Sequence, residues 1–149
     1  MGNLELMYFK RQTSPDVDIP AEIFGIFYMI LALGSRQIQL TSGIGDDGPH
    51  VRSSGDDTIY FEKAMSYYDA VIKLGTLRTV QFLELQALWY VFTGKRSLAL
   101  QTTGSVVKLS LELGLHRYSR RFDFNPVTTE IRKRIFWVCY ILDRYVPII

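Results

Sequence analysis

Cysteine is nearly absent from this sequence of 149 residues, which contains only Cys139. One cysteine excludes an internal disulfide. It also excludes a zinc site built mainly from thiolates, because such sites need several cysteines. The scarcity of cysteine gives no sign of a secreted disulfide scaffold and fits an intracellular protein.

Long apolar runs and a strong net charge are also missing. The longest apolar stretch, 23–34, is shorter than the ~20 residues that cross a bilayer, and no basic leader precedes an apolar run at the Met1 end. The chain has 17 basic and 15 acidic side chains and a net charge of only +2. The electrostatic field of so small a net charge is too weak to indicate a nucleic acid or an anionic membrane as partner. We therefore expect a soluble chain that is not secreted and that contacts no membrane.

The composition that remains is that of an ordinary globular domain. Hydrophobic residues make up 48% of the chain and charged residues 21%, which is enough to bury one apolar core. No segment alternates apolar and polar residues with a period of two over a useful length, so nothing supports a sheet. The predicted fold is all-α: a single domain, 1–149, of antiparallel helical hairpins with about five main helices.

Three glycines divide the chain at regular intervals. Gly75, Gly94 and Gly114 lie 19 and 20 residues apart, and each follows a segment whose apolar residues recur every three or four positions. This pattern is typical of helices that end at a glycine in the left-handed conformation, where the missing Cβ removes a steric cost. Leu115, directly after the third glycine, is expected to pack against the last turn as in a Schellman motif.

Caps and apolar periodicity give the expected helices. They run from 21 to about 39, from 57 or 58 to about 74, from a Thr76 cap to Gly94, from 97 to Gly114, and from 126 to about 145. Their expected starts are Pro20, Asp57 or Thr58, Thr76, Ser97, and Asn125 with Pro126. The first helix is apolar nearly all round, which predicts a central place in the fold.

The side chains expected to be buried follow from the same periodicity. They are Ile23, Phe24, Phe27, Ile30 and Leu31; Phe61, Ala64, Met65, Tyr68 and Ile72; Val80, Leu83, Leu88, Val91 and Phe92; and Leu100, Val106, Val107, Leu111 and Leu113. Between the first two helices, 41–57 is rich in glycine, serine and aspartate, a composition that buries too little surface to order itself. We predict a mobile surface loop there.

Several short segments together resemble one known family. They read YFEKA at 60–64, TLRTVQ at 76–81, LGLHR at 113–117 and EIRKRIFW at 130–137, followed by Tyr140 and by LDR at 142–144. In this order, over roughly 30–144, they are similar to the middle homology region of fungal zinc-cluster transcription factors. That region is also called the xylanolytic transcriptional activator regulatory domain. The family-motif residues are His116, Arg117, Glu130, Arg134, Trp137, Asp143 and Arg144.

The resemblance implies a helical regulatory domain in nuclear proteins that control transcription of metabolic genes. In that family, DNA and zinc are bound by an N-terminal cysteine cluster, which this chain lacks, so we expect no cofactor and no direct nucleic-acid contact here. The implied partners are an attached DNA-binding module, other proteins or a small-molecule inducer. The alternative interpretation is a truncated regulator that acts as a helical protein–protein scaffold without DNA binding. An enzyme is not expected.

The family pattern continues beyond Arg144 into further helices. Without them, the side chains of Trp137, Ile141 and Tyr145 are expected to stay uncovered and to form an apolar patch that favours association.

Basic residues near the last helix have two interpretations. Arg117, Arg120, Arg121, Arg132, Lys133 and Arg134 could converge on a phosphate. The better interpretation is a solvated, salt-bridged face, because Glu130 lies four residues before Arg134 and can pair with it along the helix. Asp143 is expected to be structural, accepting from Arg134 or from a neighbouring helix.

Other chemistry-bearing residues also favour structural roles. His116 follows a helix end that mildly favours a cation, and no nucleophile or carboxylate lies at a spacing that would make it a catalytic base; His50 has still less context. Cys139 is expected to be a small buried hydrophobe rather than a reactive thiol. The aromatic residues could line an inducer cavity but at helical spacing are usually core. They are Phe24, Phe27, Tyr28, Tyr67, Tyr68, Trp89, Tyr90, Phe92, Phe136, Trp137 and Tyr140.

Overall fold

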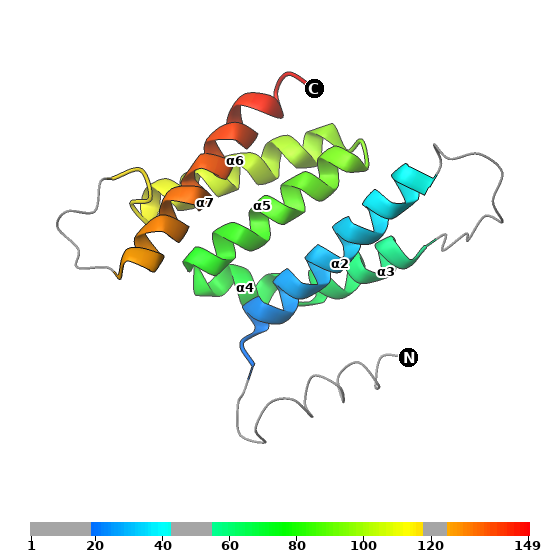
Figure 1. Ribbon diagram of the computed structural model, residues 1–149, viewed down its shortest axis with the longest axis horizontal. Helices are drawn as coiled ribbons and strands as arrows, with labels where there is room; N and C mark the ends of the chain where they lie inside the picture. The colour runs from blue at the N-terminus through cyan, green and yellow to red at the C-terminus, as the bar shows by residue number, and fades with distance from the viewer. Residues whose placement is uncertain (1–18, 43–54, 118–124) are drawn as a thin grey trace.

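The computed structural model describes residues 19–42, 55–117 and 125–149. Within these ranges the chain forms six helices and no strand, so the all-α prediction is confirmed (Figure 1). The helices are α2 (Ala21–Ser42), α3 (Asp56–Ser66), α4 (Tyr68–Leu74), α5 (Leu77–Phe92), α6 (Arg96–Glu112) and α7 (Pro126–Tyr145).

Helix α5 is the centre of the fold. It packs against α2 on one side and α6 on the other, and it also contacts α4 and α7. The prediction that the first helix is central is wrong, because α2 leaves Ile30 and Ile38 exposed on its outer side. Helix α5 instead buries residues on nearly every side, from Thr79 and Val80 to Trp89 and Tyr90.

The predicted helix over 57–74 is divided in two at Tyr67. This residue ends α3, its N–H bonds to the Ala64 carbonyl, and its ring stacks at 5.7 Å from Phe24 and 6.2 Å from Tyr28. The break shifts the register of the buried face. Val71 is therefore fully buried, whereas the predicted Ile72 is exposed.

The glycine stops lie where the sequence predicts them. Gly75, Gly94 and Gly114 all have left-handed φ values, of 57°, 72° and 67°. After α6, the Leu115 N–H donates to the Ser110 carbonyl and the Gly114 N–H to Leu111, which is the Schellman pattern. Leu115 is buried against the core, as predicted.

Caps are confirmed at two helices. The Thr76 hydroxyl accepts from the Thr79 N–H in a reciprocal capping box, and it donates to the carboxylate of Glu22, which ties the first turn of α2 to the start of α5. At α7, the Asn125 side chain accepts from the Val127 N–H at 3.0 Å, with Pro126 in the first turn.

The other predicted starts have mixed outcomes. Helix α2 begins at Ala21, directly after Pro20, as predicted, whereas α6 begins at Arg96 rather than at Ser97. Neither Asp57 nor Thr58 caps α3, which starts at Asp56 after Gly55 at φ 128°. The buried Asp57 carboxylate instead lies 3.5 Å from the Arg36 guanidinium and joins α3 to α2.

Both ends of the segment predicted as a mobile loop, 41–57, are helical. Residues 41–42 continue α2 and residues 56–57 open α3, and 43–54 lie outside the described residues.

Small side chains set the packing of α6. Its buried residues are Ala99, Thr103, Val106 and Ser110, spaced at four, three and four positions. This narrow face lets α6 run back along α5 at close range (Figure 1). The larger residues predicted to be buried, Leu100 and Leu111, are exposed, as are Phe92 at the end of α5 and Ile30 in α2.

Helix α2 alone among the described helices is long and apolar enough to cross a membrane by length and composition. Charged groups tie both of its ends into the domain, however, because Glu22 bonds to Thr76 and Arg36 pairs with Asp57. The helix packs on α3 and α5, and we interpret it as an outer helix of the bundle rather than a membrane span.

Candidate functional sites around the last helix

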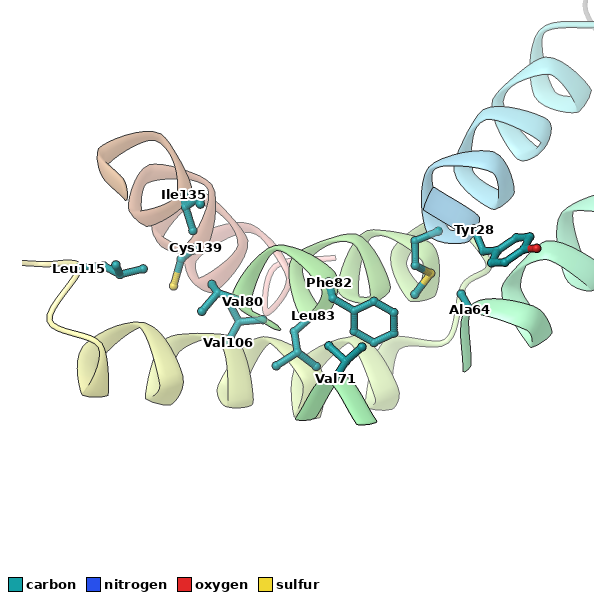
Figure 2. Close-up of a cluster of buried hydrophobic side chains, with 11 residues drawn as sticks. Tyr28, Ala64, Val71, Val80, Phe82, Leu83, Val106, Leu115, Ile135 and Cys139 are labelled. Carbon is teal, nitrogen blue, oxygen red and sulfur yellow. The ribbon is translucent and has the colours of Figure 1, made fainter. Parts of the chain in front are cut away.

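Helix α7 docks on α5 and α6 through a narrow strip. Ile135, Cys139 and Leu142 are buried on this strip, and Val146 extends it just past the helix. Figure 2 shows Ile135 and Cys139 close to Leu115, Val80 and Val106 of the neighbouring elements. The rest of α7 is largely exposed.

A buried polar cluster lies under this strip. The Ser110 hydroxyl and the Cys139 thiol are 3.3 Å apart between α6 and α7. Glu84 comes from α5, is 6% exposed, and its Oε1 has no hydrogen-bond partner among the described residues. Burial raises the pKa of Glu84 to about 8, and a backbone hydrogen bond from Cys139 only partly offsets the effect. Glu84 therefore carries a proton at neutral pH in the folded chain.

The surroundings of Cys139 disfavour the thiolate form of its side chain. Burial raises the pKa of its thiol, the bond with Ser110 partly offsets this, and the charges of Glu84 and Asp143 raise it further. Less thiolate forms at neutral pH, and thiolate is the reactive species. Its predicted burial as a small hydrophobe is confirmed.

Two of the basic residues bond to other groups of the chain. Arg132 Nη2 donates to the Leu113 carbonyl at 2.9 Å and helps hold α7 against the end of α6. Arg134 pairs with Glu130 at 3.0 Å, as predicted from their spacing. Arg117 and Lys133 are exposed. Arg120 and Arg121 lie outside the described residues.

The expected partner of Asp143 is wrong. Arg134 is held by Glu130, and Asp143, nine residues further along the helix, is exposed. No hydrogen bond or ion pair within the described ranges joins Asp143 to a neighbouring helix. Arg144 instead lies 5.4 Å from the centre of the Tyr140 ring.

His116 is exposed just after the end of α6, and His50 lies outside the described residues.

The aromatic residues are divided between core and surface. Tyr28, Trp89 and Tyr90 are buried, Phe24, Phe27, Tyr67, Tyr68 and Phe136 are half-buried, and Phe92, Trp137 and Tyr140 are exposed. The Phe61 ring stacks on Trp89 at 4.9 Å in the core. The predicted core role therefore holds for most of the set.

One cavity of about 260 Å³ lies beside the end of α7. It is lined by Tyr90, Val91, Gly94, Arg96, Ala99, Val146 and Ile149. Arg96 Nη2 donates to the Pro147 carbonyl at 2.9 Å and joins α6 to the turn after α7. Only Tyr90 comes from the aromatic set. The cavity is slightly smaller than the ~300 Å³ at which ligand pockets typically begin, and its lining is mostly aliphatic.

The outward side of α7 is exposed among the residues that the structure describes, as predicted. Trp137 is 52% exposed, and Ile141 and Tyr145 are each 59% exposed.

Sequence reasoning missed Glu84, whose only signal was a carboxyl between Leu83 and Leu85 on an apolar helix. It also missed the contact of Arg96 with Pro147. No group of three or more metal-binding side chains gathers in the part of the chain that the structure describes.

The fold and these sites define an all-helical domain, whose last helix packs through one narrow strip and presents aromatic side chains outward. The model of the fungal specific transcription factor domain matches residues 8–149, and the chain belongs to that family. The resemblance seen in the sequence is thereby confirmed.

Curated relatives are named as regulators of transcription. An ABC-transporter-regulating transcription factor of Aspergillus oryzae is 34% identical over 96 residues, covering 58% of this chain and 10% of that protein. Pyrimidine pathway regulatory protein 1 of Saccharomyces cerevisiae is 29% identical over 145 residues, covering 92% of this chain and 14% of that protein. This chain thus spans a small part of the length of these relatives. No solved structure matches.

Proposed function

We propose that this chain is a non-enzymatic regulatory domain of a fungal transcription factor that acts in the nucleus. The carrying observation is the family match over residues 8–149, supported by relatives that are named as regulators. DNA and zinc would be bound by a separate module of the complete factor, because the single cysteine of this chain is buried in the α6–α7 contact.

The packing of α7 suggests how such a domain would transmit a signal. The helix is held by a narrow strip, and the cavity lies between α5, α6 and the turn that follows α7. A small molecule in the cavity, or a protein on the outward side, would favour one arrangement of α7 over another by its different affinity for the two.

A reporter experiment tests this function. Residues 1–149 are inserted between a heterologous DNA-binding module and a heterologous activation segment, and transcription is measured in a fungal host. We expect output to differ from that of a fusion without the chain. Leu142→Ala, which loosens α7, should shift it again, while the exposed Lys73→Gln should not. Equal output from all fusions would contradict the proposal.

The exposed side of α7 favours one second candidate, a scaffold that binds other proteins without controlling an attached module. Trp137 and Ile141 are the large apolar side chains that would anchor such a partner. A chain that binds a partner but leaves the reporter unchanged would support the scaffold.

A further inference from the structure

Glu84 is a carboxyl group buried under α7 with one oxygen left without a partner. The residue is 6% exposed, and its Oε1 accepts no hydrogen bond from any described residue. None of the ion pairs between described residues includes it. A negative charge at this position would be stabilised only by a backbone hydrogen bond from Cys139. The packing of α5 therefore suits the neutral, protonated carboxyl.

The helices that pack on α5 from the other sides bring no cation to Glu84. The buried face of α6 consists of small or uncharged side chains. All charged side chains of α2, α4 and α6 are exposed or bonded elsewhere. They are Glu22, Arg36, Asp69, Lys73, Arg96, Lys108 and Glu112.

Helix α7 faces Glu84 with the Cys139 backbone and thiol. The charge of Glu84 acts on this thiol, and so does that of Asp143, which is also negative. The basic residues of α7 are exposed or, for Arg132, bonded to the end of α6. No cation described on α7 therefore compensates a charged Glu84.

Opening the contact between α7 and α5 is the least disruptive way to bring Glu84 into water. Only three of the 20 residues of α7 are buried, whereas nine of the 16 residues of α5 are. The buried strip of Ile135, Cys139 and Leu142 is therefore the smallest surface whose separation exposes the carboxyl. An element that covers the outward side of α7 would move with the helix, so the opening depends only on this inward strip.

We propose that Glu84 is a pH-sensitive switch: the protonated carboxyl allows α7 to lie on α5, and loss of the proton to solvent releases the inward strip of α7. Helices α2, α3 and α5 stay packed, because their contacts with one another do not involve α7. The inference rests on the proposed function for its cellular role only, in which a change in the arrangement of α7 is the signal.

The sign and size of the effect follow from the two environments of Glu84. Burial raises its pKa from 4.5 to about 8 while α7 is closed, and the group regains its ordinary pKa when water reaches it. Between these values the closed form binds more protons, so a rise in pH favours the open form. The ratio of open to closed chains should increase roughly fiftyfold between about pH 5.5 and about pH 7.5.

Amide hydrogen exchange, read by mass spectrometry on the full chain, measures the opening of each helix. Wild type and Glu84→Gln are compared at each pH, so that the intrinsic pH dependence of exchange cancels. For residues 126–145 we expect the ratio of wild-type to variant exchange rates to rise roughly fiftyfold over this pH range. At about pH 7.5 the amides of α7 in the wild type should exchange before those of α2 and α3.

Two matched variants identify the titrating group. Glu62→Gln makes the same chemical change at an exposed position of α3 and should exchange as the wild type does at every pH. Asp143→Asn removes the other negative charge that acts on Cys139 and should keep the pH dependence of the wild type. Should Glu84→Gln fail to fold, labelling of Cys139 by a thiol reagent gives a second measurement. Its rate in the wild type, divided by that of an unstructured cysteine peptide, should rise with pH in the same proportion.

Three results would overturn the proposal. One is a ratio for α7 that stays constant with pH. Another is a common exchange rate for α2, α3 and α7 at about pH 7.5, because the whole domain would then be opening at once. The third is loss of the pH dependence in Asp143→Asn, which would assign it to that residue. None of these measurements uses the reporter, so failure here is distinguishable from failure of the proposed function.

Discussion

Replacing Glu84 with glutamine would test whether a buried carboxyl group limits the stability of the α5–α7 contact. Burial raises the pKa of this group from 4.5 to about 8 in the folded chain. The unfolded chain releases the proton near pH 4.5, whereas the folded chain holds it to about pH 8. Between these values the folded state binds more protons, so the free energy of unfolding should fall as pH rises.

The magnitude follows from the width of that window. Each pH unit corresponds to about 1.4 kcal/mol, so at pH 7 the group lowers the free energy of unfolding by about 3 kcal/mol relative to pH 4.5. Glutamine has a similar shape and takes up no proton. Glu84→Gln should therefore be more stable than the wild type by up to about 3 kcal/mol at pH 7 and by under about 1 kcal/mol at pH 5.

Urea denaturation followed by circular dichroism, at several pH values between about 5 and 8, measures this difference. Glu62→Gln makes the same chemical change at an exposed position of α3 and should track the wild type. A difference between Glu84→Gln and the wild type that does not grow with pH would refute the reasoning. So would a Glu84→Gln variant that is less stable at pH 7.

Three further predictions concern stability, each measured by thermal or urea denaturation. Gly25→Ala would place a Cβ 3.0 Å from the Phe82 ring and should lower the free energy of unfolding by about 1–3 kcal/mol. Gly34→Ala lies in open space on the same helix and should raise the free energy of unfolding by about 0.5–1 kcal/mol. Equal effects of the two substitutions would contradict the close approach of Gly25 to Phe82. Thr76→Ala removes the cap of α5 and should cost about 1–2 kcal/mol, and an unchanged midpoint would show that the capping box is dispensable. Asp143→Ala should change stability by less than about 0.5 kcal/mol, since the side chain is exposed, and a larger loss would restore a structural role for it.

Local signals predicted the ends of most helices. Gly94 and Gly114 end their helices because the left-handed turn is decided by the glycine and its nearest neighbours. Thr76 and Asn125 cap theirs because a hydroxyl or amide needs only a backbone N–H two or three residues away. These interactions depend on adjacent residues alone, so one sequence is enough to find them.

The features that could not be predicted from the sequence, namely the break at Tyr67 and the buried face of α6, depend on packing between helices. Nothing near Tyr67 marks a break, which arises where its ring stacks with Phe24 and Tyr28 of another helix. The buried face of α6 follows small residues such as Ala99 and Ser110 rather than leucines, because close approach to α5 favours little side-chain volume. Periodicity gives the width of an apolar face but not which neighbour will cover it.

Among the candidate site residues, too, contacts within one helix could be predicted from the sequence, whereas contacts between helices could not. The Glu130–Arg134 pair was predictable because both lie on one helix at a fixed spacing. Glu84 was not, since its buried position depends on α7, about 50 residues away in the chain, lying across α5. The wrong partner for Asp143 has the same cause: the side chain lies on a flank of α7 that no described helix covers.

The attachment of α7 affects the order in which the chain can fold during synthesis. Both described helices that it touches, α5 and α6, precede it in the sequence. The pairwise contacts of α2 with α3, of α2 with α5 and of α5 with α6 can therefore form while residues 126–145 are still inside the ribosome. Helix α7 is the last described piece to be added, and it can be withdrawn without separating α2 from α3 or α5.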